Sequence, residues 1–163
     1  MKVVADAGPL IALAKIDRLG LLAELFDEVC LPIVVEHEIL AKAGPETKRI
    51  EAALGRFLRV IPPPYDLTAH LAMKAGALGV GERAVIAVAV MLPPAVSVLM
   101  DDRAGRAVAR QAGLAVLGLA GLLIMARQRG AITAAVPLML AAREAGYWLD
   151  DELVATVRRL AKE

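Results

Sequence analysis

The chain has 163 residues, a formal net charge of +1 and a composition that is 58% hydrophobic but only 3% aromatic. This length is sufficient for one domain with a large aliphatic core, and the composition excludes an intrinsically disordered chain. The nearly balanced charge also excludes the strongly basic surface of a dedicated nucleic-acid-binding module, although acids gathered at a metal site would offset basic residues elsewhere.

Two uncharged runs, residues 84–100 and 111–126, raise the question of a membrane segment. Both are shorter than the roughly 20 apolar residues that a spanning helix needs, and Pro93-Pro94 interrupts the first. We therefore expect buried elements and no membrane association. The start of the chain lacks a secretory signal, and the single cysteine, Cys30, cannot form an internal disulfide, so the expected location is the cytoplasm.

Proline and glycine divide the first half of the chain into short segments. Pro9 suits the first position of a helix, and Gly44-Pro45 ends the segment before it. In chain order, we expect a strand at residues 2–5, a turn at 6–9, helices at 10–16 and 19–26, a strand at 29–31, helices at 33–42 and 46–54, and a strand at 57–61.

The second half continues the same alternation, with Pro93-Pro94 expected to stop one helix and Gly113 another. We expect helices at 67–75 and 82–91, a strand at 96–100, a helix at 103–111, a strand at 114–117, and helices at 119–129, 133–144 and 152–162. Strands that alternate with helices predict an α/β protein whose parallel sheet carries helices on both faces. Because no linker-like run interrupts the pattern, we expect a single domain over residues 1–163, with the helices beyond about residue 133 packed on the core.

Several acids stand where an apolar run ends or a helix begins. Asp6 closes the first strand, Glu38 lies in the helix after the second, Glu82 opens a helix, and Asp101-Asp102 follow the strand at 96–100. If the first strand and the strand at 96–100 are adjacent, their acids share the carboxyl edge of the sheet, where α/β proteins bind ligands. Converging carboxylates repel each other, and a hard divalent cation relieves that repulsion. The pattern therefore predicts a metal-dependent active site that holds Mg²⁺ or Mn²⁺.

Each acid also has an ordinary explanation when it is taken alone. Asp6 suits the cap of the helix that follows it, Glu38 suits a solvated helix face, and Glu82 suits a first helical turn. Asp101 and Asp102 suit the cap and first turn of the helix at 103–111. Only the joint placement of these acids favours the metal site.

Basic and aromatic residues suggest where a substrate would lie. Arg103, Arg106 and Arg110 share one face of a helix, which indicates either contacts with phosphates beside the acids or a solvated, carboxylate-paired face. We favour a role at the edge of the site for Arg106. Tyr147 and Trp148 are expected to pack the C-terminal helix, with stacking on a base as the alternative.

Five segments, in the same order, resemble those of PIN-domain proteins, in a prokaryotic branch close to VapC-type toxins. They are VVADAGPLIAL at 3–13, PIVVEHEI at 32–39, GVGE at 79–82, LMDDRAGR at 99–106 and GLAGLL at 118–123. The resemblance implies a Rossmann-like three-layer sandwich with about five parallel strands and a Mg²⁺- or Mn²⁺-dependent endoribonuclease that hydrolyses RNA. Such proteins often form homodimers, and toxins of this type pair with an antitoxin protein.

Carried over by position, the resemblance makes Asp6, Glu38, Glu82 and Asp102 the metal acids, with Asp101 as a rival for the last place. Arg103 and Arg106 are the candidate phosphate contacts.

The chain departs from this family pattern at two positions. Many relatives carry Ser or Thr where this chain has Gly8, so a hydroxyl able to hold a metal-bound water is absent there. Relatives of this branch often have a second acid where this chain has Ala84. These departures motivate an alternative hypothesis, in which the chain is a catalytically weak or inactive module that binds RNA or protein.

Overall fold

The computed structural model describes residues 1–92 and 95–163, so the expected helix stop at Pro93-Pro94 lies outside the described residues. Five strands form one parallel sheet in the order β3-β2-β1-β4-β5. The strands are β1 (Lys2–Ala5), β2 (Glu28–Pro32), β3 (Leu58–Ile61), β4 (Val96–Leu99) and β5 (Ala115–Leu117). The predicted α/β architecture with a parallel sheet is thereby confirmed.

Helices occupy most of the remaining described chain. They are α1 (Ala7–Lys15), α2 (Leu21–Leu25), α3 (Ile33–Leu40), α4 (Pro45–Ala53), α5 (Ala69–Lys74), the 3₁₀ turn η1 (Ala75–Ala77), α6 (Val80–Met91), α7 (Arg103–Gln111), α8 (Leu119–Gln128), α9 (Val136–Glu144) and α10 (Asp151–Ala161). Within the part of the chain that the structure describes, we find no helix with the length and hydropathy needed to cross a bilayer.

The order of the strands puts the first strand at the centre of the sheet. β1 pairs with β2 on one side and with β4 on the other, and Ala5 lies opposite Leu99. The chain leaves this centre in both directions, which creates the crevice where α/β sheets bind ligands. The Asp6 N–H donates to the Leu99 carbonyl at 2.9 Å, so the carboxyl ends of β1 and β4 meet as predicted.

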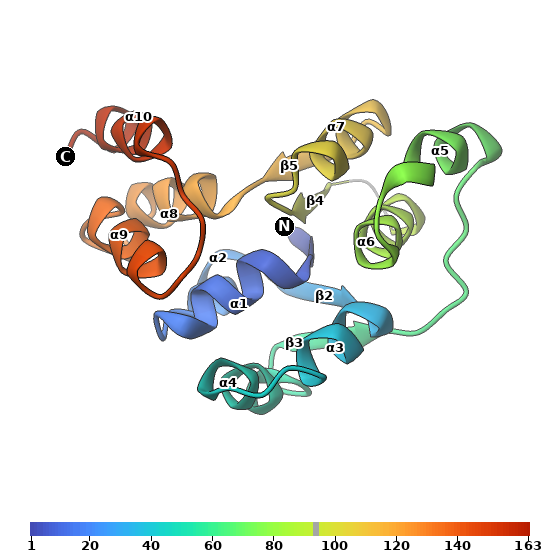
Figure 1. The fold of residues 1–163 in the computed structure, drawn as a ribbon, viewed down its shortest axis with the longest axis horizontal. Helices are drawn as coiled ribbons and strands as arrows, with labels where there is room; N and C mark the ends of the chain where they lie inside the picture. The colour runs from blue at the N-terminus through green and yellow to red at the C-terminus, as the bar shows by residue number, and fades with distance from the viewer. Residues whose placement is uncertain (93–94) are drawn as a thin grey trace.

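Helices cover both faces of the sheet (Figure 1), with α5 and α6 on the side opposite α1 and α9. α6 packs across β1, β2 and β4, while α1 packs against α3, α4 and α9. The core is aliphatic, and Val3, Val4 and Ala5 of β1 are fully buried. Because both faces of β1 are covered, a side chain at its end can reach solvent only if a crevice opens there. Asp6 is the residue at this position.

Two helices, α1 and α9, begin at other residues than the sequence predicts. The expected turn at 6–9 is wrong, because α1 begins at Ala7 and Pro9 lies in its first turn, where a missing N–H costs little. α9 begins at Val136 rather than 133, since Pro137 sets the first turn. The Glu163 carboxylate accepts the N–H groups of Ala135 and Val136 at 2.7 and 3.0 Å, which fixes this helix start to the end of the chain.

Candidate active site

Asp6 is a buried acid without an obvious structural duty. It is the one buried polar or charged residue among those the structure describes, with 8% of its surface exposed. It occupies the N-cap position of α1, yet its side chain makes no capping hydrogen bond. Capping alone therefore does not explain an acid at this position.

The surroundings of Asp6 disfavour its negative charge. Burial is the main cause that raises the pKa of Asp6 from 3.8 to about 7, and the backbone N–H of Ala7 opposes the rise. The charges of Glu82, Glu38 and Asp102 raise the pKa further, in that order. Three of the acids predicted from the sequence thus act on the fourth from different elements.

Gly81 keeps a small space open between two of these acids. It lies in the first turn of α6, and a Cβ added to it would lie 3.3 Å from Glu38 Oε2 and 3.7 Å from Asp6 Oδ1. The carboxylates of Asp6 and Glu38 therefore border the same point, although Asp6 follows β1 and Glu38 lies on α3. Glu38 also contacts Lys42 one turn later, at 3.4 Å in an exposed pair worth little stability.

Glu82 lies in the first turn of α6, as predicted, where the helix dipole favours an anion. Its carboxylate folds back over Gly79, and a side chain at that position would collide with it. The charge of Glu82 contributes to the raised pKa of Asp6. The orientation of the Glu82 side chain is thus set by the start of α6.

Asp101 and Asp102 serve different helices, so the alternative in which both serve the helix at 103–111 is wrong. Asp102 is the N-cap of α7, and its Oδ2 accepts from the Gly105 N–H at 2.6 Å. The Asp101 oxygens accept from the Leu119 N–H at the start of α8, at 3.1 and 3.3 Å. Oδ2 of Asp101 also accepts from the Tyr147 hydroxyl at 2.6 Å. Asp102 acts on Asp6 through its charge, whereas Asp101 is more completely hydrogen-bonded.

Three arginines of α7 form a small hollow with Asp101. The residues that line this hollow of about 190 Å³ are Asp101, Arg103, Arg106 and Arg110. A Cβ at Gly118 would lie 2.5 Å from Asp101 Oδ1 and 3.2 Å from an Arg106 guanidinium nitrogen. Arg106 is half-buried, and its Nε has no hydrogen-bond partner among the described residues. A concentrated positive charge therefore lies directly beside an acid of the site.

The donor set fits a hard divalent cation in its chemistry, because it consists of carboxylate oxygens around a buried acid. Gly81 leaves room between two of them. In the described ranges 1–92 and 95–163, however, we find no group of three or more Asp, Glu, His or Cys side chains already closed around one metal position. The charges of three acids act on Asp6, but the four carboxylates are not gathered at one point.

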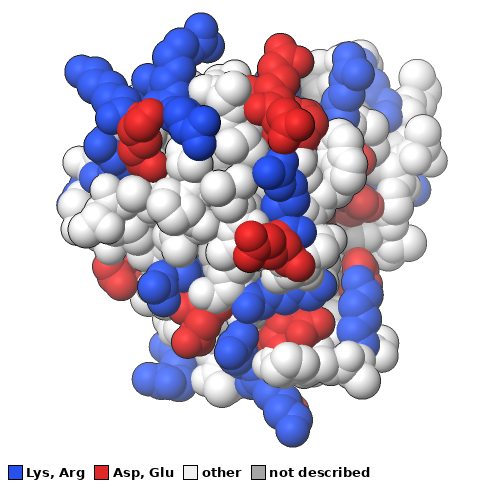
Figure 2. Space-filling view, turned by 60° about the vertical axis from the view of Figure 1, so that its left-hand side comes forward, with Lys and Arg blue, Asp and Glu red and all other residues white. Residues whose placement is uncertain are grey.

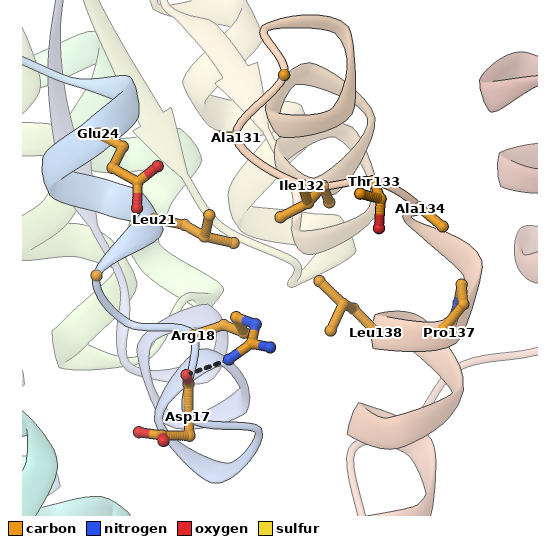
Figure 3. Close-up of a pocket in the computed structure, with 12 residues that line it drawn as sticks. Asp17, Arg18, Leu21, Glu24, Ala131, Ile132, Thr133, Ala134, Pro137 and Leu138 are labelled. Atoms are coloured by element: carbon orange, nitrogen blue, oxygen red, sulfur yellow. Dashed lines mark hydrogen bonds between the residues drawn. The ribbon is translucent and has the colours of Figure 1, made fainter.

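The groove in Figure 3 lies away from these acids. It is about 560 Å³ in volume and lies between the turn after α1, with Asp17 and Arg18, and the turn after α8, with Ile132 and Thr133. Both helices start at the carboxyl edge of the sheet, so their ends lie at the opposite edge. Figure 2 shows basic and acidic side chains interspersed on the face in view, as the net charge of +1 suggests.

The structure places four further residues that the sequence singled out. The Tyr147 hydroxyl lies beside Gly8, since a Cβ at Gly8 would be 3.4 Å from it. The expected packing of Tyr147 and Trp148 together is wrong for Trp148, which is 82% exposed. Ala84 is buried on α6, where a carboxylate would itself need compensation. A role for Tyr147 was missed because the only signal was its position after Gly146 at the end of a helix.

Comparison with known proteins identifies the family of this chain. A family model described as a PIN domain matches residues 2–163, which is nearly the whole chain. No curated protein matches the chain.

The raised pKa of Asp6 predicts how stability depends on pH. The folded state holds the Asp6 proton more tightly than the unfolded chain does, so the free energy of unfolding falls as pH rises toward about 7. Asp6→Asn removes this titration. Between pH 5 and pH 8, wild type should lose about 2 to 3 kcal/mol relative to Asp6→Asn in urea unfolding without metal. Parallel pH profiles for the two proteins would contradict the burial of a titrating acid.

The open space at Gly81 predicts a variant that separates stability from metal binding. Gly81→Ala should keep or raise stability, since Ala favours a helix by about 0.5 to 1 kcal/mol. Its Cβ would occupy the space between Glu38 and Asp6, so Mn²⁺ affinity should fall roughly 10-fold. Gly76→Ala is the control, because a Cβ there meets no atom within 4 Å. Equal Mn²⁺ affinity of the two variants, by calorimetry, would exclude this space as the metal position.

Proposed function

Since this chain belongs to the PIN-domain family, whose members are generally nucleases, we propose that it is a Mg²⁺- or Mn²⁺-dependent endoribonuclease. The observation that carries the proposal is the buried Asp6 carboxylate at the centre of the sheet, with the charges of Glu38, Glu82 and Asp102 directed at it. Such a group of acids is costly in a folded protein unless it binds cations.

Asp6, Glu38, Glu82 and Asp102 would hold the cation, with Asp101 as an alternative ligand. A bound Mg²⁺ or Mn²⁺ supplies activation of water and neutralisation of the charge that develops on the phosphodiester. The buried position of Asp6 would keep bulk water away from its carboxylate. Asp101 is already anchored by the start of α8, so it would orient neighbouring groups without moving.

The arginine hollow supports RNA as the substrate class. Arg103, Arg106 and Arg110 bring positive charge next to Asp101, and guanidinium groups bind phosphates through paired N–H donors. A phosphate held there lies beside the acids, which is the arrangement that cleavage of a neighbouring phosphodiester requires. Contacts of these arginines with phosphate would hold the RNA backbone irrespective of its sequence.

A second candidate function is an RNA- or protein-binding module with weak or no turnover. It is supported by the splayed acids, which do not close on one point within the described residues, and by Gly8 and Ala84. The two functions differ in metal binding. Saturable Mn²⁺ binding that requires Asp6 supports the nuclease, and its absence supports the module.

A cleavage assay tests the nuclease directly. Structured and single-stranded RNA should be cut in Mn²⁺ but not in EDTA, and Asp6→Asn should lower the rate at least about 100-fold, because the cation stabilises the transition state by several kcal/mol. Asp17→Asn is the matched control, since Asp17 lies at the groove of Figure 3 at the other edge of the sheet. Cleavage that persists in EDTA or in Asp6→Asn would overturn the site.

The phosphate contact is tested by RNA binding in EDTA, where no turnover is expected. Arg106→Ala should weaken binding to unrelated RNA sequences by a similar factor and reduce the dependence of log affinity on log salt by about one. Arg159→Ala, exposed in the last turn of α10, should change neither. An unchanged salt dependence in Arg106→Ala would remove this arginine from the RNA contact.

A further inference from the structure

The hydroxyl of Tyr147 lies between the start of α1 and the end of β4, far along the chain from both. It donates to Asp101 Oδ2 at 2.6 Å. It also lies over Gly8, where an added Cβ would come within 3.4 Å of the oxygen. Gly8 follows Asp6 by two residues, so the hydroxyl lies over the first turn of the helix that Asp6 precedes. Tyr147 therefore touches one acid and stands near another.

The turn that carries Tyr147 is fixed by backbone geometry. α9 ends in a Schellman motif, in which Gly146 adopts a φ of 90° that only glycine adopts readily. The Gly146 N–H donates to Arg143 O at 3.0 Å, and the Tyr147 N–H donates to Ala142 O at 2.9 Å. Lys15 of α1 adds a bond from its Nζ to Ala145 O at 3.1 Å. Figure 1 shows this connection between α9 and α10 passing beside α1.

The hydroxyl is a permanent donor toward Asp101. A phenol has an ordinary pKa of about 10 and is protonated at neutral pH, so it can donate to a carboxylate. That proton is directed to Asp101, which leaves the oxygen lone pairs as acceptors. The small residue at position 8 leaves the adjoining space free, and a water molecule there could donate to the Tyr147 oxygen.

We propose that Tyr147 is a positioning residue of the acid site and supplies, from the C-terminal segment, the hydroxyl that position 8 lacks. It orients Asp101 and offers an acceptor to water beside Asp6. Gly8 and Tyr147 form one functional pair, because a side chain at position 8 would take the space that the Tyr147 hydroxyl borders. This inference rests on the proposed metal-dependent function.

A second tyrosine shows what a purely structural hydroxyl does in this protein. The Tyr65 hydroxyl accepts from the Ile33 N–H at 3.0 Å and donates to Ile61 O at 2.5 Å, joining the start of α3 to the end of β3. Both of its partners are backbone groups. The Tyr147 hydroxyl has a carboxylate partner instead, that of Asp101 directly after β4. Tyr65→Phe is therefore the matched control for Tyr147→Phe.

The first test measures Mn²⁺ affinity by calorimetry and thermal unfolding without metal, on the full chain. Tyr147→Phe should weaken Mn²⁺ binding by 10-fold or more, which is the usual effect of removing a group that orients a metal ligand. Tyr65→Phe should lower the melting temperature with little change in Mn²⁺ affinity. If both variants lose affinity in proportion to their loss of stability, the Tyr147 hydroxyl is only structural and the inference is overturned.

Rescue provides the second test. Gly8→Ser places a second hydroxyl beside that of Tyr147, because a Cβ at position 8 lies 3.4 Å from the Tyr147 oxygen. The double variant Gly8→Ser/Tyr147→Phe should recover most of the Mn²⁺ affinity. Failure of this recovery would overturn the pairing of Gly8 with Tyr147.

The two proposals fail in different ways. If wild type shows no saturable Mn²⁺ binding, or if Asp6→Asn binds Mn²⁺ as wild type does, the proposed function falls and this inference falls with it. If Asp6→Asn abolishes binding while Tyr147→Phe binds as tightly as wild type, only the role of Tyr147 is overturned.

Discussion

The candidate site depends on one unfavourable interaction, the burial of the Asp6 carboxylate at the end of the central strand. The side chain is 8% exposed, makes no capping bond and faces the charges of three other acids. Burial of a charge is tolerated when a group of opposite charge compensates it. The nearby acids have the same charge as Asp6, so each of them makes its ionised form less favourable. Protonation relieves the cost at low pH, and a divalent cation relieves it where the acid is ionised. The strain in this group of acids is thus a reason for the site to bind metal.

Small residues and distant segments complete the arrangement around that acid. Gly81 keeps the space between Asp6 and Glu38 open, and Gly8 leaves room for a hydroxyl that arrives from the turn after α9. The same turn is held by Lys15, so the segment after α9 packs against α1. Loss of a hydroxyl at one position of a family pattern need not mean its loss from the site, because the fold can deliver the same group from another segment.

Much of the fold was predictable because Pro, Gly and apolar runs mark the elements directly, and the helix at 103–111 has the bounds of α7. The sequence did not predict that β1 and β4 are adjacent, and the site prediction assumed it. Strand order depends on contacts between residues far apart in sequence. The split between Asp101 and Asp102 could not be read, because the backbone direction at the end of β4 decides which helix each acid meets. The contact of Tyr147 with Asp101 could not be predicted either, because the two residues are 46 positions apart in the chain.

The most direct measurement is the position of bound Mn²⁺, located by anomalous diffraction from crystals soaked at a pH above 7.5. We expect a peak about 2.2 Å from the Asp6 carboxylate and from at least one of the other acids at this edge. Under saturating Mn²⁺, a peak found only in the groove of Figure 3, or no peak within reach of Asp6, would contradict it.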